Sequence, residues 1–360
     1  MNRKKINHLL LVFLLIMFFF SILLFYYFFN NNNFENIKNN KIFILKQEKN
    51  KDKDLINNNE IIKIYIWWDI MLSRMVGYLN QKEWFDRIIR KYNPITQTWW
   101  LIFFNLESPF SIYPKDWINS SYYFWAHTGS IEVLSKLKWD NKMIVWLANN
   151  HIRNSLKEWI NTTINLLNKN NILFNWIWIK KQNKQEFTKI KINNKLVCLQ
   201  AFSYDWGDYL YIKVNKIKKE YIKKSLDLMK KNNCDLNLIS LHWWKEYKFE
   251  PSEKQVKLAH YTIDNWADMI IGHHSHIFWK TETYKNKPIF YSLWNYIFDQ
   301  DNIVNNCPKN KDCIFDEKSK KKILPVNIWV AYELKFEKHK LISKIQKKHR
   351  IKHYWELIKY

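Results

Sequence analysis

The sequence predicts an α/β domain that includes a mixed second sheet and follows one transmembrane helix. Three observations support this fold class. From residue 61 onward, apolar strand-like runs alternate with amphipathic helical stretches. Two hairpin-like pairs, at 188–203 and 281–293, add antiparallel strands to this pattern. A long apolar run also lies close to the N-terminus.

That apolar run indicates an uncleaved signal anchor. Residues 1–8 carry three basic side chains, and residues 9–29 are apolar except for Ser21. About 21 helical residues, at roughly 1.5 Å each, suffice to cross a hydrocarbon core about 30 Å thick. The basic residues favour a cytoplasmic N-terminus, and the run ends without the small-residue site of a cleaved signal peptide. We therefore expect a single-pass protein of the cell membrane whose remaining chain lies outside the cytoplasm.

The rest of the chain divides by composition into three parts. Residues 30–60 are rich in Asn, Lys and Asp and are typical of a flexible, solvated linker. Residues 61–335 are long enough for one large domain, and residues 336–360 are predicted to form a basic C-terminal tail.

Within the domain, each element is predicted from hydrophobic periodicity and from flanking turn residues. The strand candidates are Ile61–Ile66, Leu101–Asn105, Met143–Ala148, Ile172–Ile179, Leu236–Leu241, Asp268–Ile271 and Ile328–Phe336. The helix candidates are Glu83–Tyr92, Ser130–Leu137, Leu156–Asn168, Ile217–Lys231 and Ser252–Asn265, the last with Ser252 as its N-cap. The hairpins are predicted to turn at Asn193-Asn194 and at Asn286.

Tryptophan and glycine occur in unusual numbers. The chain has 20 Trp and 4 Gly, and the 24 together come close to the share of about 7% that Gly alone has in an average protein. Tandem Trp residues at 67–68, 99–100 and 243–244 stand where Gly-Gly would mark a turn. We hypothesise that most of these Trp are glycines, encoded by UGA codons that the cell reads as Gly. The alternative is a truly Trp-rich protein, in which these codons would be UGG.

The net charge limits the class of binding partner, and the cysteines bear on metal binding and on the redox compartment of the protein. The net charge is +25, but the lysines are scattered, which favours an anionic lipid, envelope polymer or acidic substrate over nucleic acid. No pair of the 4 cysteines has CxxC metal spacing. Cys198 is predicted to be a plain core residue, whereas Cys307 and Cys313 are expected to form either a disulfide or a free pair.

Polar side chains that bind metals follow one strand candidate after another. Because the carboxyl ends of strands in an open α/β sheet line one crevice, we expect these groups to converge. Individually each has an ordinary explanation, such as a turn, a helix cap or a core histidine. Together they favour a metal or phosphate-type site, and these ligand types suit Mn, Fe or Zn. The groups are Asp69; Asn105 and Glu107; Asn149, Asn150 and His151; His242 with Glu246; and His273, His274 and His276.

Reading Gly for Trp produces six motifs in order. They are GGDIMLSR at 67–74, NLESP at 105–109, GLANNH at 146–151, HGGKEY at 242–247, NGADMIIGHHSH at 265–276 and YSLGNYIFD at 291–299. In order and spacing this series resembles the CapA family, capsule-synthesis proteins linked to poly-γ-glutamate. The resemblance covers about residues 61–335.

The resemblance implies a calcineurin-like metallophosphoesterase fold, a four-layer sandwich of two mixed β-sheets flanked by helices. It also implies one or two divalent ions, although Met71 stands where that superfamily has a His, and Asn105 and Glu107 replace its bridging Asp motif. His151 would be the general acid, Arg74 would hold an anionic oxygen, and Glu246 would be a ligand, a base or a partner of His242. The implied metal ligands are Asp69, Asn105, Glu107, Asn150, His242, His274 and His276.

Two functions follow as expectations. The first is a membrane-anchored, metal-dependent hydrolase that acts on a phosphoester or on an anionic envelope polymer, alongside other capsule-synthesis proteins. The alternative is a non-catalytic binding or scaffold subunit of a complex for polymer synthesis or export.

Overall fold

The structure is a computed structural model that describes the chain from residue 60 to residue 350, with gaps. The described residues are 60–73, 76, 100–112, 124–154, 157–175, 178–179, 187–204, 212–213, 215–243, 248, 250–276, 281–292, 295–297, 314–316, 321–323 and 328–350. The predicted transmembrane segment 9–29, linker residues 30–59 and the helix candidate Glu83–Tyr92 lie outside them. None of the helices in the described ranges is both long and apolar enough to span a bilayer.

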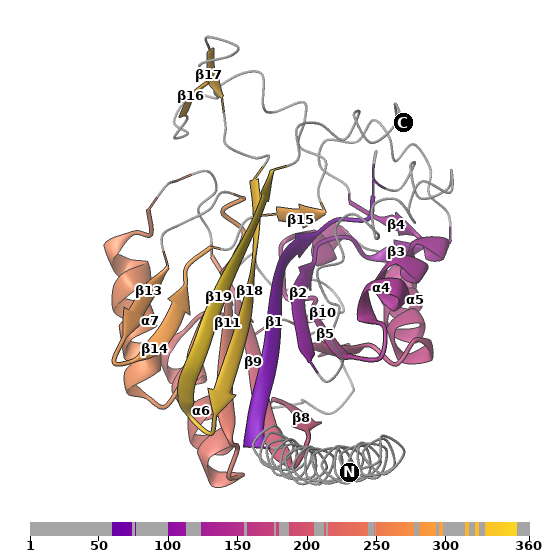
Figure 1. Cartoon of the computed structure of the whole chain (residues 1–360). Helices are drawn as coiled ribbons and strands as arrows, with labels where there is room; N and C mark the ends of the chain where they lie inside the picture. Colours follow the sequence, from indigo (N-terminus) through magenta and orange to yellow (C-terminus); the bar gives the residue numbers. More distant parts are fainter. Residues whose placement is uncertain are drawn as a thin grey trace, which may run out of the picture. The chain divides into compact units, whose positions relative to one another are not determined.

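A seven-stranded mixed sheet forms one half of the domain (Figure 1). Four neighbouring strands run parallel, and a C-terminal hairpin pairs antiparallel with the first of them. In spatial order the strands are β19 (Lys340–Arg350), β18 (Ile328–Glu337), β1 (Ile61–Ile70), β2 (Leu101–Leu106), β5 (Lys142–Trp146) and β6 (Leu173–Asn175). The short β15 (Asn295–Ile297) pairs parallel with the end of β1.

A six-stranded mixed sheet forms the other half. Its four central strands are parallel, and an antiparallel strand closes each edge. In spatial order the strands are β13 (Glu282–Tyr284), β14 (Lys287–Phe290), β12 (Met269–His273), β11 (Leu236–His242), β9 (Lys195–Ser203) and β8 (Thr188–Ile192).

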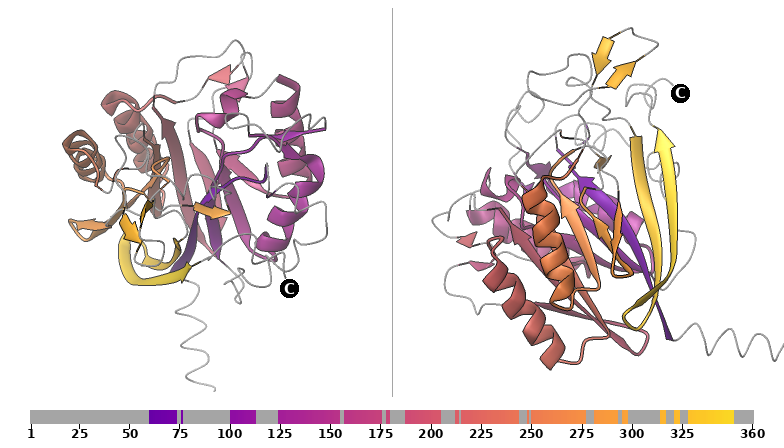
Figure 2. Two further views of the ribbon diagram at one scale, coloured as in Figure 1. Left: turned by 90° about the horizontal axis from the view of Figure 1, so that it is seen from above. Right: turned by 90° about the vertical axis from the view of Figure 1, so that its left-hand side faces the viewer.

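Helices cover the outer side of each sheet. Figure 2 shows one pair of helices beyond the first sheet and another pair beyond the second, so the layers run helix, sheet, sheet, helix. The first pair is α4 (Ile131–Lys138) and α5 (Lys157–Lys169), and the second is α6 (Lys219–Lys231) and α7 (Glu253–Asp264). The shorter elements are β3 (Phe110–Ser111), β4 (Ala126–His127), β7 (Trp178–Ile179), β10 (Ile212–Lys213), β16 (Ile314–Asp316), β17 (Lys321–Ile323), η1 (Thr128–Ser130) and η2 (His151–Asn154).

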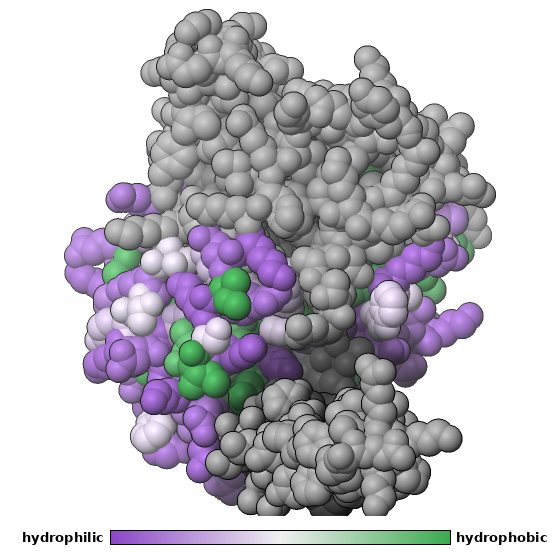
Figure 3. Space-filling model, viewed as in Figure 1, coloured by the Kyte–Doolittle hydropathy of each residue, from purple (hydrophilic) through white to green (hydrophobic). Residues whose placement is uncertain are grey.

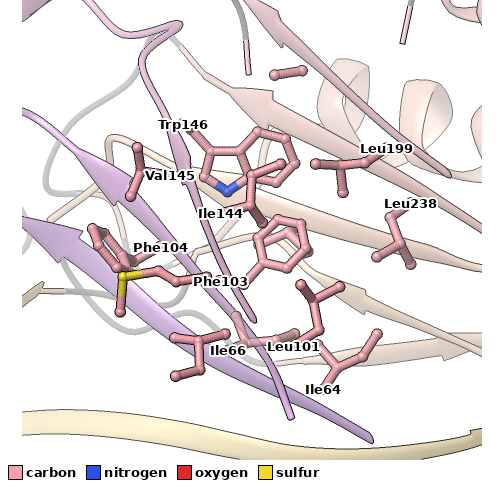
Figure 4. Packing of buried hydrophobic residues seen from close by; sticks show 14 of the residues in the cluster. Ile64, Ile66, Leu101, Phe103, Phe104, Ile144, Val145, Trp146, Leu199 and Leu238 are labelled. Atoms are coloured by element: carbon pink, nitrogen blue, oxygen red, sulfur yellow. The ribbon is translucent and has the colours of Figure 1, made fainter. Parts of the chain in front are cut away.

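The main core lies between the two sheets. Every residue of β2 and of β11 is buried, as expected for parallel strands covered on both faces. Figure 4 shows side chains of β1, β2 and β5, among them Ile64, Leu101 and Trp146, close to Leu199 of β9 and Leu238 of β11. This packing fixes the two sheets against each other and thereby aligns their strand ends.

The described surface on one face of the domain is mostly hydrophilic (Figure 3). Hydrophobic residues form small groups there, in the part of the view that β18 and β19 occupy. On β19, Ile342 and Ile345 are 43% and 47% exposed. Scattered exposed apolar residues of this kind are ordinary for a solvated surface.

The α/β class, the mixed sheets and both hairpins are confirmed. Helix α7 begins after Ser252 as predicted, and Gln255 Oε1 accepts the Ser252 backbone N–H at 2.8 Å, as in a capping box. The predicted strand 172–179 is instead two strands, β6 and β7, which belong to different sheets. Strand β1 runs on to Ile70 through a register irregularity between Ile66 and Asp69, so Asp69 lies within the strand and does not follow it.

The fold continues past residue 335, where the sequence predicted a basic tail over 336–360. Strand β19 pairs with β18 from Glu337↔Lys340 to Ile328↔Arg350. Its lysines are compatible with a strand because Lys347 forms an ion pair with Glu333 of β18, while Leu341 packs against the core. The Lys-rich composition led to the prediction of a tail, but this segment includes the edge strand β19. Lysines are common on edge strands.

Cys198 is not a plain core residue, because it forms a disulfide with Cys234. Cys198 lies in β9, and Cys234 lies in the connection between α6 and β11. Their Cα atoms are 5.8 Å apart, within the usual range for a disulfide. Cys307 and Cys313 lie outside the described residues.

Two tryptophans have backbone conformations that favour glycine. Trp139 follows α4 with φ 49° and ψ −135°, and Trp266 lies just beyond α7 with φ 81°. Both indoles are largely exposed, at 65% and 57%. Helix C-terminal positions of positive φ are where Gly is most often found, because a Cβ atom is strained there.

Candidate metal centre

The carboxyl ends of strands from both sheets meet at one place. In the first sheet, Asp69 of β1 is in register with Asn105 of β2 on one side and with Asn295 of β15 on the other. In the second sheet, His242 of β11 pairs with His273 of β12. The sheets are close enough here for His273 Nδ1 to lie 3.0 Å from Asp69 Oδ1. The predicted convergence of strand ends is therefore present.

Two carboxylates and one imidazole form the centre of this region. One ligand atom each from Asp69, Glu107 and His276 lie within 4.8 Å of one another. The three side chains are buried, with exposures of 1%, 0% and 3%. His276 Nδ1 lies 3.7 Å from Asp69 Oδ2, and His276 Nε2 lies 3.9 Å from Glu107 Oε2. Buried carboxylates are costly unless paired or bound to a cation, so their grouping points to a cation site.

Asp69 is held in its ionised form. Burial by itself raises the pKa of the Asp69 carboxyl, but the hydrogen bond and charge of His273, with the charge of His276, outweigh it. The net pKa of Asp69 is therefore below its ordinary value. The His274 backbone N–H, 3.4 Å from Asp69 Oδ2, adds a further long contact.

An amide lies between the two carboxylates. Asn105 Nδ2 donates to Asp69 Oδ1 at 2.9 Å and to Glu107 Oε1 at 2.8 Å. The amide oxygen of Asn105 instead accepts a hydrogen bond from Asn149 Nδ2 at 3.0 Å. Because amides coordinate metals through oxygen, the structure differs here from the predicted role of Asn105 as a ligand.

Two further buried imidazoles, those of His242 and His274, lie near the histidines that contact the carboxylates. His242 Nε2 lies 3.0 Å from Asn150 Oδ1, and the His242 and His274 ring centroids are 4.7 Å apart. Burial, together with the charges of His274 and the other nearby histidines, holds the pKa of His242 well below its ordinary value. His242 is therefore neutral at pH 7, the form in which imidazole binds metals. Its Nδ1 atom finds no hydrogen-bond partner among the residues that the structure describes.

His151 lies at the rim. Its Nε2 atom is 3.9 Å from Glu107 Oε2 and 3.2 Å from Asn150 Nδ2, and its ring packs on Phe124 with centroids 4.1 Å apart. The His151 side chain is 13% exposed, more than any of the three central residues. It can therefore contact both solvent and the centre.

The turn after β12 has an unusual backbone. His274 and His276 have φ values of 86° and 51°, a region that residues with a Cβ atom rarely adopt. The neighbouring contact of His276 Nδ1 with Asn295 Oδ1, at 2.9 Å, helps to hold this turn. Such conformations cost about 1–3 kcal/mol each and are concentrated at functional sites.

Most of the predicted site residues come together. Those within the region are Asp69, Asn105, Glu107, Asn150, His151, His242, His274 and His276. Arg74 and Glu246 lie outside the described residues. Among the three clustered histidines, whose roles the sequence left open, His273 contacts Asp69, His274 faces His242, and His276 joins the carboxylates.

These residues suit a divalent cation. Two buried carboxylates supply negative charge, and buried imidazoles supply nitrogen donors, a set typical of Mn, Fe or Zn sites. His242 Nδ1 and His273 Nε2 both lack a hydrogen-bond partner within the described ranges. Fold and site together define an α/β sandwich protein with a buried carboxylate–imidazole centre that fits a metal.

The chain belongs to the family of bacterial capsule synthesis proteins, PGA_cap, whose family model matches residues 63–300. The chain is 26% identical to the PGA biosynthesis protein CapA of Bacillus subtilis, over 68% of this chain and 65% of that one. It is also 26% identical to the capsule biosynthesis protein CapA of Bacillus anthracis, over 67% of this chain and 61% of that one. The matched region thus spans somewhat less than two thirds of the length of these relatives.

Two solved structures are similar to this chain at low identity. A structure described as a novel phosphatase from Mycoplasma pneumoniae has a TM-score of 0.47 and 12% identity, covering 83% of this chain and 97% of that one. A hypothetical protein from Thermus thermophilus has a TM-score of 0.43 and 11% identity, covering 80% and 99%.

Proposed function

We propose that this protein is a metal-dependent hydrolase of the bacterial envelope, acting on a phosphoester or on a bond of an anionic, poly-γ-glutamate-type capsule polymer. The observation that carries the proposal is the buried grouping of Asp69, Glu107 and His276 where the two sheets meet. Membership of the capsule synthesis family supports the polymer as the context. The net charge of +25 suits a polyanionic substrate.

The residues of the centre have different proposed roles in the reaction. Asp69, Glu107 and His276, with His242, would hold a divalent ion, which when bound polarises the scissile group and lowers the pKa of bound water. Asp69 meets the need for an ionised ligand, and the lowered pKa of His242 keeps that ring neutral at pH 7. His151, whose side chain at the rim is 13% exposed, donates a proton to the leaving group. Arg74 and Glu246 keep their predicted roles as anion binder and as ligand, base or partner of His242.

The proposed location is outside the cytoplasm, with residues 9–29 as the membrane anchor. The Cys198–Cys234 disulfide supports this location, because structural disulfides are typical of oxidising compartments.

The test uses the full-length protein in detergent, with Mn²⁺ or Zn²⁺ and two substrates, a generic phosphodiester and poly-γ-glutamate. We expect turnover that is lost in His151→Ala and His276→Ala, whereas His260→Ala stays active. His260 is a matched control because it is a part-buried histidine that contacts Glu282, 2.7 Å away. Wild-type protein that binds metal yet turns over neither substrate would refute the hydrolase proposal.

Two observations favour a second candidate, a non-catalytic scaffold subunit of a polymer synthesis or export complex. Met71 is fully buried at the position where the metallophosphoesterase resemblance implies a His, and Asn105 presents its nitrogen, not its oxygen, to the carboxylates. Both differences reduce the number of ligands for a second ion. A scaffold would keep its partner binding in His151→Ala and would show no turnover in any variant.

A further inference from the structure

The Asn149 amide has only one orientation that satisfies its surroundings. Asn149 is 1% exposed and lies three residues after the end of β5 at Trp146. Its Oδ1 atom accepts the backbone N–H groups of His151 at 3.1 Å and Ile152 at 3.0 Å. Its Nδ2 atom donates to the backbone carbonyl of Leu106 at 2.8 Å. Backbone N–H groups only donate and carbonyls only accept, so a flipped amide would lose all three bonds.

This fixed amide sets the orientation of a second one. Asn149 Nδ2 also donates to Asn105 Oδ1 at 3.0 Å, so the oxygen of Asn105 must face Asn149. The nitrogen of Asn105 then faces the carboxylates and donates to Asp69 Oδ1 and to Glu107 Oε1. Hydrogen bonds thus connect four buried side chains, from Asn149 to Asn105 and from Asn105 to both carboxylates. The direction of these bonds is determined by the backbone groups that hold Asn149.

The hydrogen bonds of Asn105 determine which oxygen of each carboxylate faces the centre. Because Asp69 Oδ1 and Glu107 Oε1 are occupied by Asn105, their other oxygens, Oδ2 and Oε2, are the ones nearest to His276. The two N–H donors also separate two buried negative charges that would otherwise repel each other.

We infer that Asn149 is a positioning residue of the metal centre. Asn149 acts through Asn105, whose hydrogen bonds hold Asp69 and Glu107 in a metal-binding arrangement. Neither asparagine is itself a metal ligand in this arrangement. This inference rests on the proposed metal-dependent function and concerns how its ligands are held. Groups that orient metal ligands typically change metal affinity about 10–100-fold when they are mutated.

The test compares two buried asparagines in the full-length protein. Asn149→Asp keeps the acceptor for His151 and Ile152 but cannot donate to Asn105. Asn175→Asp is the matched control, since Asn175 is also 1% exposed and its amide bonds Thr188, Leu199 and Ala201, none of which belongs to the centre. We expect calorimetric titration with Mn²⁺ to show an affinity about 10–100-fold weaker for Asn149→Asp and unchanged for Asn175→Asp.

A second variant guards against misfolding. Asn149→Ser keeps a hydroxyl acceptor for the His151 and Ile152 N–H groups but is too short to reach Asn105, and the same loss of Mn²⁺ affinity is expected. Melting curves in EDTA report whether each variant is folded. Unchanged Mn²⁺ affinity in a folded Asn149→Asp or Asn149→Ser protein would overturn the inference.

A double-variant cycle tests whether Asn149 acts through Asn105. In an Asn105→Ala background, Asn149→Asp should weaken Mn²⁺ binding no further, whereas two full, additive losses would contradict the inference. If the wild-type protein binds no Mn²⁺, the proposed function fails, and the melting temperatures in EDTA then decide the inference. If the two amides are coupled, the melting temperature of the double variant falls by less than the sum of the decreases in the two single variants. A decrease equal to that sum would contradict the coupling.

Discussion

Replacing Trp139 with glycine should make this protein more stable, although the change removes a whole indole. Trp139 adopts φ 49° and ψ −135° after α4, a conformation that is strained for any residue with a Cβ atom. We propose that the native residue here is glycine, in keeping with the UGA hypothesis raised by the composition. Trp266, with φ 81° beyond α7, is a second such position.

The magnitude follows from three contributions. Relief of a sparsely populated backbone conformation contributes about 1–3 kcal/mol. The greater flexibility of glycine in the unfolded chain reduces this gain by about 0.5–1 kcal/mol. The lost indole contacts weigh little, because Trp139 is 65% exposed and its Nε1–H donates to the exposed Asp140. Taken at the midpoints of these ranges, the net gain in the free energy of unfolding is about 1 kcal/mol, or a melting temperature higher by about 2–4 °C for a domain of this size.

The assay is thermal and urea unfolding of the wild type, Trp139→Gly and a control, Trp100→Gly. Trp100 is 3% exposed, packs edge-on against Tyr65 at 6.1 Å and is not among the residues of positive φ. Its replacement should cost about 3–5 kcal/mol through lost packing. A Trp139→Gly variant that is no more stable than the wild type would refute the argument from strain.

The origin of the residue can be read directly. In protein purified from its own cells, the mass of the tryptic peptide that follows Lys138 distinguishes glycine from tryptophan at position 139. The codon hypothesis predicts the glycine mass, and a tryptophan mass would end it.

Three further predictions concern stability. Cys198 and Cys234, which are 36 positions apart, form a disulfide whose reduction should lower the free energy of unfolding in urea by about 2–5 kcal/mol. A Cys198→Ser/Cys234→Ser variant should not show this loss on addition of reductant. The hydrogen bond to Asp268 raises the pKa of His339, so the stability from this pair is fully present below the ordinary value of 6.5 and is lost as pH rises through the raised value. Urea midpoints measured on both sides of that range should show this loss in the wild type and not in His339→Gln. Finally, Mn²⁺ at about 100 times its Kd should stabilise the wild type by about 2.7 kcal/mol over protein in EDTA, and Asp69→Asn should abolish the difference.

The sequence was sufficient to predict the centre because strand ends carry a strong local signal. Asp69, His242 and the 273–276 cluster each follow or end an apolar run, and parallel strands bring such ends to one edge. The pattern could not show how the side chains are oriented. The direction of the Asn105 amide depends on Asn149, which lies 44 positions away in the chain. Backbone groups of Leu106, His151 and Ile152 in turn hold Asn149.

Other features depend on contacts between distant parts of the chain. Cys198 and Cys234 are 36 positions apart, and only the packing of the α6 to β11 connection against β9 brings them together. Strand β19 is rich in lysine and has a weak alternation, so its pairing with β18 is set by the hairpin and not by a hydrophobic pattern.

The proposed function requires one cation bound where the two sheets meet. Anomalous diffraction from crystals of the full chain grown with Zn²⁺ tests it. We predict a peak contacted by carboxylate oxygens of Asp69 and Glu107 and by a nitrogen of His276, at about 2.0–2.2 Å. No peak at these residues, or electron density that places the three side chains in separate regions, would contradict the account.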